Sequence, residues 1–87
     1  MKAYLKDGFE VEVSESVWDD WEFLEVLSDI DEGETGLIVR AVRKLLGKEG
    51  VKILKEHLRN EDGKVSSTGM VNAFGEILES VKALKNS

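Results

Sequence analysis

Apolar residues recur at intervals of three and four over positions 67–84, and this pattern constrains the fold more than any other. The stripe consists of Met70, Phe74, Ile77, Val81 and Leu84, flanked by Val71 and Leu78. On a helix of 3.6 residues per turn these positions share one face. The stripe therefore predicts an amphipathic helix that begins near Ser67 or Thr68, ends near Leu84 and buries one face in a core.

The preceding segments predict three more helices, at about 17–31, 37–46 and 48–59. Gly33 and Gly36 lie in the loop after the first helix, and Gly47 is expected to end the second. Ser16 is the expected N-cap of the first helix, and Trp21 is expected in its buried face. The apolar residues of that helix cover an arc of about 220°, which exceeds the single face that a surface helix buries.

Asp7-Gly8 predicts a two-residue turn that joins two short strands over residues 2–13. With that turn, the face to be covered carries Tyr4, Phe9, Val11 and Val13, and the other face carries Ala3, Leu5, Glu10 and Glu12. A lone hairpin is marginally stable in water, so we expect it to lie on the helices. The chain is thus predicted to be a mainly α fold with about four helices in one compact bundle and an N-terminal β-hairpin (residues 2–13), forming a single domain over residues 1–87.

Charge and composition narrow the function classes. The net charge of −6 is uneven, because residues 1–35 carry −10, residues 36–59 carry +5 and residues 60–87 carry −1. The acidic part repels phosphate, so no nucleic-acid partner is expected. The chain has no cysteine, no signal-like apolar run at its start and no stretch of about 20 apolar residues, which predicts no membrane partner and a cytoplasmic location.

The segment from Asn60 to Ser66 resembles the middle of a calcium-binding loop. Placing Gly63 at loop position 6 puts Leu58 at position 1 and Gly69 at position 12. Both positions require oxygen ligands, so the segment predicts a turn and no metal site.

Other candidate chemistry is sparse. His57 is the one histidine, and its place on the apolar side of its helix predicts a half-buried structural role. The acidic cluster Asp29, Asp31, Glu32 and Glu34 has no neighbouring histidine or cysteine, which is typical of a solvated loop. No catalytic residue and no cofactor is predicted.

The first helix carries the candidate protein interface. Trp18 falls among acidic residues, so it either tucks under the hairpin or anchors a partner, as tryptophan often does at interfaces. With the surplus apolar arc, this predicts an interface of Trp18, Phe23, Val26 and Ile30.

Several short runs in their order and spacing resemble a known family. The runs are Asp7-Gly8, Asp19-Asp20-Trp21-Glu22-Phe23-Leu24-Glu25, Leu45-Leu46-Gly47, Leu54-Lys55-Glu56-His57-Leu58-Arg59, Asp62-Gly63-Lys64-Val65-Ser66 and Phe74-Gly75-Glu76-Ile77-Leu78. The chain resembles, over nearly its whole length, the small tail assembly chaperones of long, non-contractile-tailed phages and prophages.

The resemblance implies a non-enzymatic function. Such proteins hold the helical, aggregation-prone tape-measure protein while the tail tube assembles in the host cytoplasm, and they are absent from the finished virion. This chain would correspond to the short form of the family, and its charge pattern also allows self-association. The alternatives are another phage or prophage adaptor, such as a head–tail joining factor, or a small DNA-binding regulator.

Overall fold

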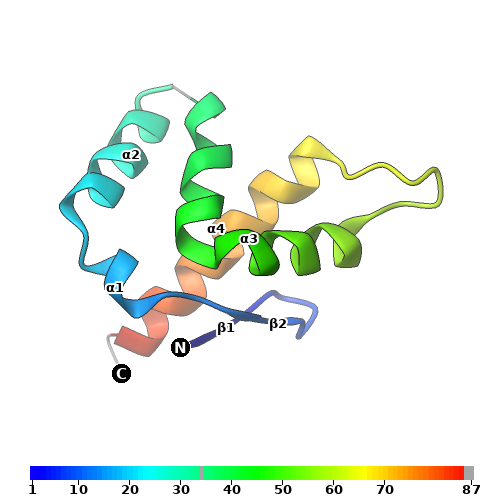
Figure 1. The fold of residues 1–87 in the computed structure, drawn as a ribbon, viewed down its shortest axis with the longest axis horizontal. Coiled ribbons are helices and arrows are strands. Elements are labelled where there is room, and N and C mark those ends of the chain that lie inside the picture. Colours follow the sequence, from blue (N-terminus) through cyan, green and yellow to red (C-terminus); the bar gives the residue numbers. More distant parts are fainter. Residues whose placement is uncertain (34, 86–87) are drawn as a thin grey trace.

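A bend at Gly47 divides the longest helix of the chain into two arms, and the other elements pack around this bend (Figure 1). The computed structural model describes residues 1–33 and 35–85. In chain order its elements are β1 (Lys2–Tyr4), β2 (Glu10–Glu12), α1 (Glu15–Trp18), α2 (Trp21–Asp31), the 3-10 turn η1 (Thr35–Leu37), α3 (Ile38–Leu58) and α4 (Ser67–Lys85). The predicted fold class is confirmed: four helices and an N-terminal hairpin.

Gly47 adopts φ 73° and ψ 173°, a backbone conformation that is essentially restricted to glycine. The prediction that it ends a helix is confirmed, because the helical geometry stops there and resumes in a new direction. We call residues 38–46 the first arm of α3 and residues 48–58 the second arm.

The hairpin turn is one residue longer than the sequence predicted. The backbone N–H of Gly8 donates to the carbonyl of Leu5 and that of Leu5 donates to the carbonyl of Phe9, so three residues form the loop. Gly8 has φ 92°, the left-handed geometry expected at the end of such a loop.

The longer loop shifts the pairing by one residue, and the predicted register was therefore wrong. Lys2 pairs with Glu12, Ala3 with Val11 and Tyr4 with Glu10. A shift of one residue on one strand exchanges its two faces. The buried face consequently carries Ala3, Leu5, Val11 and Val13, whereas Tyr4 is 46% exposed.

The predicted first helix is broken into α1 and α2 at Asp19-Asp20. Asp20 has an extended backbone, and its side chain accepts a hydrogen bond from the N–H of Glu22 at 2.9 Å. Aspartate favours this capping position, because its carboxylate satisfies a backbone donor that the helix leaves free. Ser16, the predicted N-cap, instead lies inside α1.

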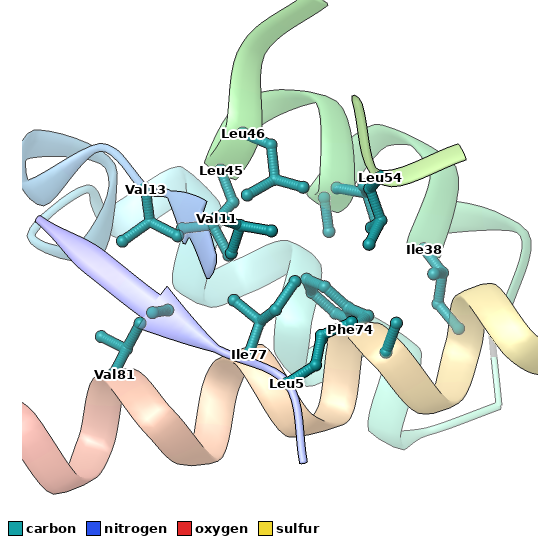
Figure 2. Close-up of a cluster of buried hydrophobic side chains, with 14 of the residues drawn as sticks. Leu5, Val11, Val13, Ile38, Leu45, Leu46, Leu54, Phe74, Ile77 and Val81 are labelled. Carbon is teal, nitrogen blue, oxygen red and sulfur yellow. The ribbon is translucent and has the colours of Figure 1, made fainter. Parts of the chain in front are cut away.

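One hydrophobic core joins the hairpin, both arms of α3 and α4. Figure 2 shows the buried side chains of β2 and the first arm facing those of α4. The fully buried large residues are Phe23, Leu45, Leu54, Ile77 and Val81. The predicted α4 stripe is confirmed at its centre, although Leu84 at its end is exposed.

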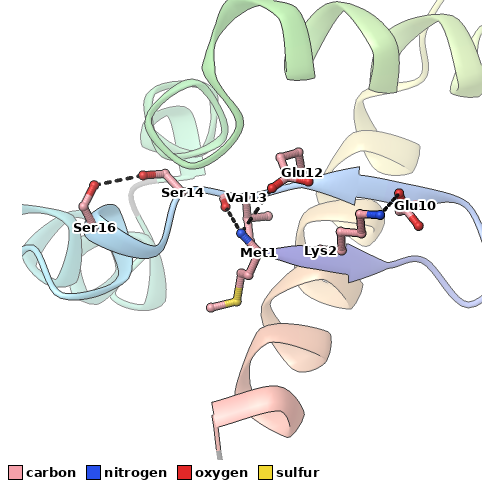
Figure 3. A network of polar contacts seen from close by, with 7 residues as sticks. All are labelled: Met1, Lys2, Glu10, Glu12, Val13, Ser14 and Ser16. Carbon is pink, nitrogen blue, oxygen red and sulfur yellow. Dashed lines mark hydrogen bonds and ion pairs between the residues drawn. The ribbon is translucent and has the colours of Figure 1, made fainter.

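Polar contacts fasten both edges of the hairpin. On the α4 side, the N–H of Tyr4 donates to Ser80 Oγ and the N–H of Lys6 donates to Glu76 Oε1. On the other side, the N–H of Ser14 donates to the carbonyl of Leu45. Figure 3 shows the end of the hairpin, where the Met1 ammonium group donates to the Val13 carbonyl and contacts Glu12.

The segment between α3 and α4 is the predicted turn. Asn60 Oδ1 accepts hydrogen bonds from the N–H groups of Asp62 and Lys64, and Arg59 Nη1 donates to the Gly63 carbonyl. The Asn60 side-chain oxygen is thus engaged by two backbone N–H groups of the turn.

Candidate protein-binding groove

The start of α4 lies on the concave side of the α3 bend (Figure 1). Residues of both arms of α3 and of the start of α4 line an apolar groove. We call it the elbow groove. Its apolar wall consists of Ile38, Val39, Val42, Val51, Val65, Met70 and Val71. Its volume is about 520 Å³.

The walls of the elbow groove are only partly covered by the chain itself. Ile38 and Val42 form part of the buried core, while Val39 is 58% exposed and Val71 is also exposed. Met70 is half-buried. Since a methionine side chain is flexible and polarisable, this wall can adapt to differently shaped apolar groups.

Two cations line the elbow groove, one from each arm. Arg43 lies one helical turn after Val39, and Lys55 lies one turn after Val51. Within residues 1–33 and 35–85, neither cation forms an ion pair, and the lining includes no acidic residue. The groove is therefore apolar inside and positively charged at its margin.

A second exposed apolar pair lies on α2. Trp21 is 72% exposed, and Leu24, one turn later on the same helix, is also exposed. The prediction that Trp21 is buried was wrong, because the break at Asp20 makes Trp21 the first residue of a new helix. Its acidic neighbours Glu22 and Glu25 give this surface the opposite charge to the elbow groove.

The predicted interface residues have different environments. Phe23 is 0% exposed, so it is a core residue and offers no surface to a partner. Trp18 is half-buried against the core, with its ring centroid 6.3 Å from that of Phe23. Val26 and Ile30 are also half-buried against the core, and an interface role for Trp18, Val26 and Ile30 stays a prediction.

Sequence reasoning did not find the elbow groove. Val39 and Arg43 fall in the predicted helix at 37–46, whereas Val51 and Lys55 fall in the separate predicted helix at 48–59. The signal that relates them is the repeated spacing of a valine and a base four residues apart, at 39 and 43 and at 51 and 55. That spacing alone does not show that the two arms face one groove.

His57 has a carboxylate partner that the sequence did not reveal. Its Nε2 lies 2.8 Å from Oδ2 of Asp7 in the hairpin turn, and its ring stacks on Phe9 with centroids 3.7 Å apart. The pKa of Asp7 lies below its usual value because the Phe9 N–H and then His57 hydrogen-bond the carboxylate. These contacts join the turn to the second arm, and the His57 side chain is 29% exposed.

Among the described residues, no group of three or more histidine, cysteine, aspartate or glutamate side chains could hold a metal ion. None of the described helices is both long and apolar enough to cross a membrane. Glu34, one of the four acids of the predicted acidic cluster, lies outside the described residues.

Comparisons with protein-family models, with curated proteins and with solved structures find no match for this chain. The resemblance to tail assembly chaperones therefore stays a prediction, and the elbow groove is the feature on which a functional proposal can be built.

Proposed function

We propose that this chain is a non-enzymatic chaperone that holds the tape-measure protein of a phage or prophage tail during assembly. It would act in the host cytoplasm and be absent from the finished virion. The proposal combines the family resemblance with one structural observation, the elbow groove.

The elbow groove supports a protein client because of its chemistry. Large exposed apolar side chains that occur singly are normal on any surface, whereas Val39 and Val71 share one concave site with half-buried Val51 and Met70. A wall of aliphatic side chains suits the apolar face of a helix, which enters such grooves in a recurring mode of recognition.

The rest of the surface supports the same role. Acidic residues crowd the first third of the chain, and such a charged exterior keeps a complex with an aggregation-prone client dispersed. A holding function requires an apolar contact and a charged exterior, and it requires no reactive group.

Co-expression tests the proposal. A phage tape-measure protein should gain several-fold in soluble yield when it is produced together with this chain. Val39→Glu places a carboxylate on the apolar wall of the elbow groove and should abolish that gain, because desolvating this charge opposes apolar contact even where Arg43, one turn later, can pair with it.

Ile53→Glu is the matched control. Ile53 is 53% exposed on the same helix, close to the exposure of Val39, but it lies outside the elbow groove. Helical circular dichroism should be the same for both variants and the parent. If the client stays insoluble beside the parent chain, the proposed function is wrong.

A further inference from the structure

We infer that the elbow groove selects an amphipathic helix whose apolar stripe is flanked by acidic side chains. This inference rests on the proposed function and specifies the chemistry of the segment that is recognised. It follows from the positions of Arg43 and Lys55 relative to the apolar wall.

The apolar wall determines which part of the ligand enters. Val39, Val42 and Val51 are branched at Cβ and stiff, so they form a firm surface. Val65, Met70 and Val71 close the other side, from the turn before α4 and its first turns. A row of aliphatic side chains at helical spacing would fill this space and remove both partners' apolar surface from water.

The cations determine what flanks that row. Arg43 and Lys55 both line the groove, one from each arm of α3, so acidic side chains beside the ligand's apolar stripe would meet positive charge. Neither has an ion-pair partner within the chain's described residues, so pairing with a ligand would break no existing ion pair. A ligand flanked by lysine or arginine would instead meet like charge at both positions.

A phosphate-rich ligand fits this site less well. Its negative charge would suit Arg43 and Lys55, but it would leave the aliphatic wall without an apolar partner.

The acidic outer face of α2, where Trp21 and Leu24 are exposed, also combines apolar and acidic side chains. A second copy of this chain could therefore occupy the groove through α2, and the test must distinguish this occupant from a client helix.

The test uses two synthetic fluorescein-labelled helical peptides of about 20 residues, long enough to form several turns. Both carry the same leucine stripe, flanked in one by glutamate and in the other by lysine. Fluorescence anisotropy with the full chain should give at least about tenfold tighter binding of the glutamate-flanked peptide, with the preference shrinking as salt rises.

Charge reversal then assigns the preference to the groove. Arg43→Glu and Lys55→Glu should each weaken the glutamate-flanked peptide about threefold to tenfold and strengthen the lysine-flanked one. Arg40→Glu and Lys52→Glu are the matched controls, because these cations lie on the same arms but do not line the elbow groove. The controls should shift each affinity less than about twofold.

Three results would overturn the inference. Equal affinity for the two peptides, or no binding of either at about 1 mM, would show that the groove does not select acidic helices. Equal effects of Lys55→Glu and Lys52→Glu would show that the selection lies elsewhere. Concentration-dependent sedimentation of the chain alone, lost in Val39→Glu, would assign the groove to a second copy.

The two proposals fail separately. If the chain selects the glutamate-flanked peptide but does not increase the solubility of the tape-measure protein, the proposed client is wrong, while the inferred preference of the groove for acidic helices stands. Rescue of the client that depends on Val39 but not on Arg43 or Lys55 would keep the proposed function and remove the acidic preference.

Discussion

His57 Nε2 lies 2.8 Å from Asp7 Oδ2, although 50 residues separate the two in the chain. Stacking of the His57 ring on Phe9, with 11° between the planes, adds an apolar contact beside the polar one. Together they attach the tip of the hairpin to the second arm of α3, the arm that also carries Val51 and Lys55 of the elbow groove.

The Asp7 carboxylate predicts a loss of stability in acid. Its pKa is lowered in the folded state, first by the Phe9 N–H and next by His57. The stabilisation is therefore present above the unfolded pKa, about 4, and is lost as the pH falls through the folded value. Asp7→Asn should reduce the fall in melting temperature between about pH 5 and pH 2.

Asp31→Asn is the control for that measurement. Asp31 is exposed at the end of α2 and has no hydrogen-bond partner for its side chain among the described residues. It should leave the acid profile of the parent unchanged. Identical profiles for Asp7→Asn and the parent would show that the turn contact contributes nothing to folding.

The hairpin register predicts which strand residues carry stability. Leu5 is 6% exposed whereas Tyr4 is 46% exposed. Leu5→Ala should therefore lower the free energy of unfolding by about 2–5 kcal/mol, and Tyr4→Ala by less than about 1 kcal/mol. Urea denaturation measures both losses. A larger loss for Tyr4→Ala than for Leu5→Ala would contradict the observed register and support the one that a two-residue turn implies.

Gly47 predicts a stability cost for any side chain at the bend. At φ 73° and ψ 173°, Gly47→Ala should destabilise the chain by about 1–3 kcal/mol. Gly75 inside α4 has open space where a Cβ would stand, so Gly75→Ala should stabilise the chain by about 0.4–1 kcal/mol. Thermal melts of the two variants should move in opposite directions from the parent.

Trp21 and Phe23 are two residues apart in α2 and should respond oppositely to truncation. Phe23→Ala removes a fully buried ring and should cost about 3–5 kcal/mol, a large part of the stability of a domain this size. Trp21→Ala should change the free energy of unfolding by less than about 0.5 kcal/mol. A loss above about 2 kcal/mol for Trp21→Ala would place Trp21 in a packed environment after all.

Local patterns predicted the features that depend on local chemistry. The stripe from Met70 to Val81, the break at Gly47 and the turn at Asn60 each follow from side chains close in sequence, and the structure confirms them. These elements determine the fold class.

The hairpin register and the break between α1 and α2 were predicted wrongly, because in each case the local sequence is compatible with two structures. Asp7-Gly8 suits both a two-residue and a three-residue loop, and the choice follows from which strand face packs best against α3 and α4. Asp20 could lie within the first turn of one long helix or cap the start of a second helix, and in the structure it is the N-cap of α2. Each choice moved one aromatic residue, Tyr4 or Trp21, to the surface.

The elbow groove depends on the angle between two helices, which no short pattern encodes. Its residues come from both arms of α3, from Val65 and from the start of α4. The contact between Asp7 and His57 is similarly non-local. Such sites arise only when separate elements are placed together, so sequence patterns do not group their residues.

Seating of the hairpin on α4 has a consequence for the chain as it leaves the ribosome. The N–H groups of Tyr4 and Lys6 are satisfied by Ser80 and Glu76, and contacts at such separation form only after both segments have emerged. A two-stranded hairpin is barely stable alone. The first strand can therefore pack on α4 only after residue 80 has been synthesised. In a nascent chain stalled before that point, the apolar residues Ala3, Leu5 and Val11 would stay exposed to chaperones and proteases.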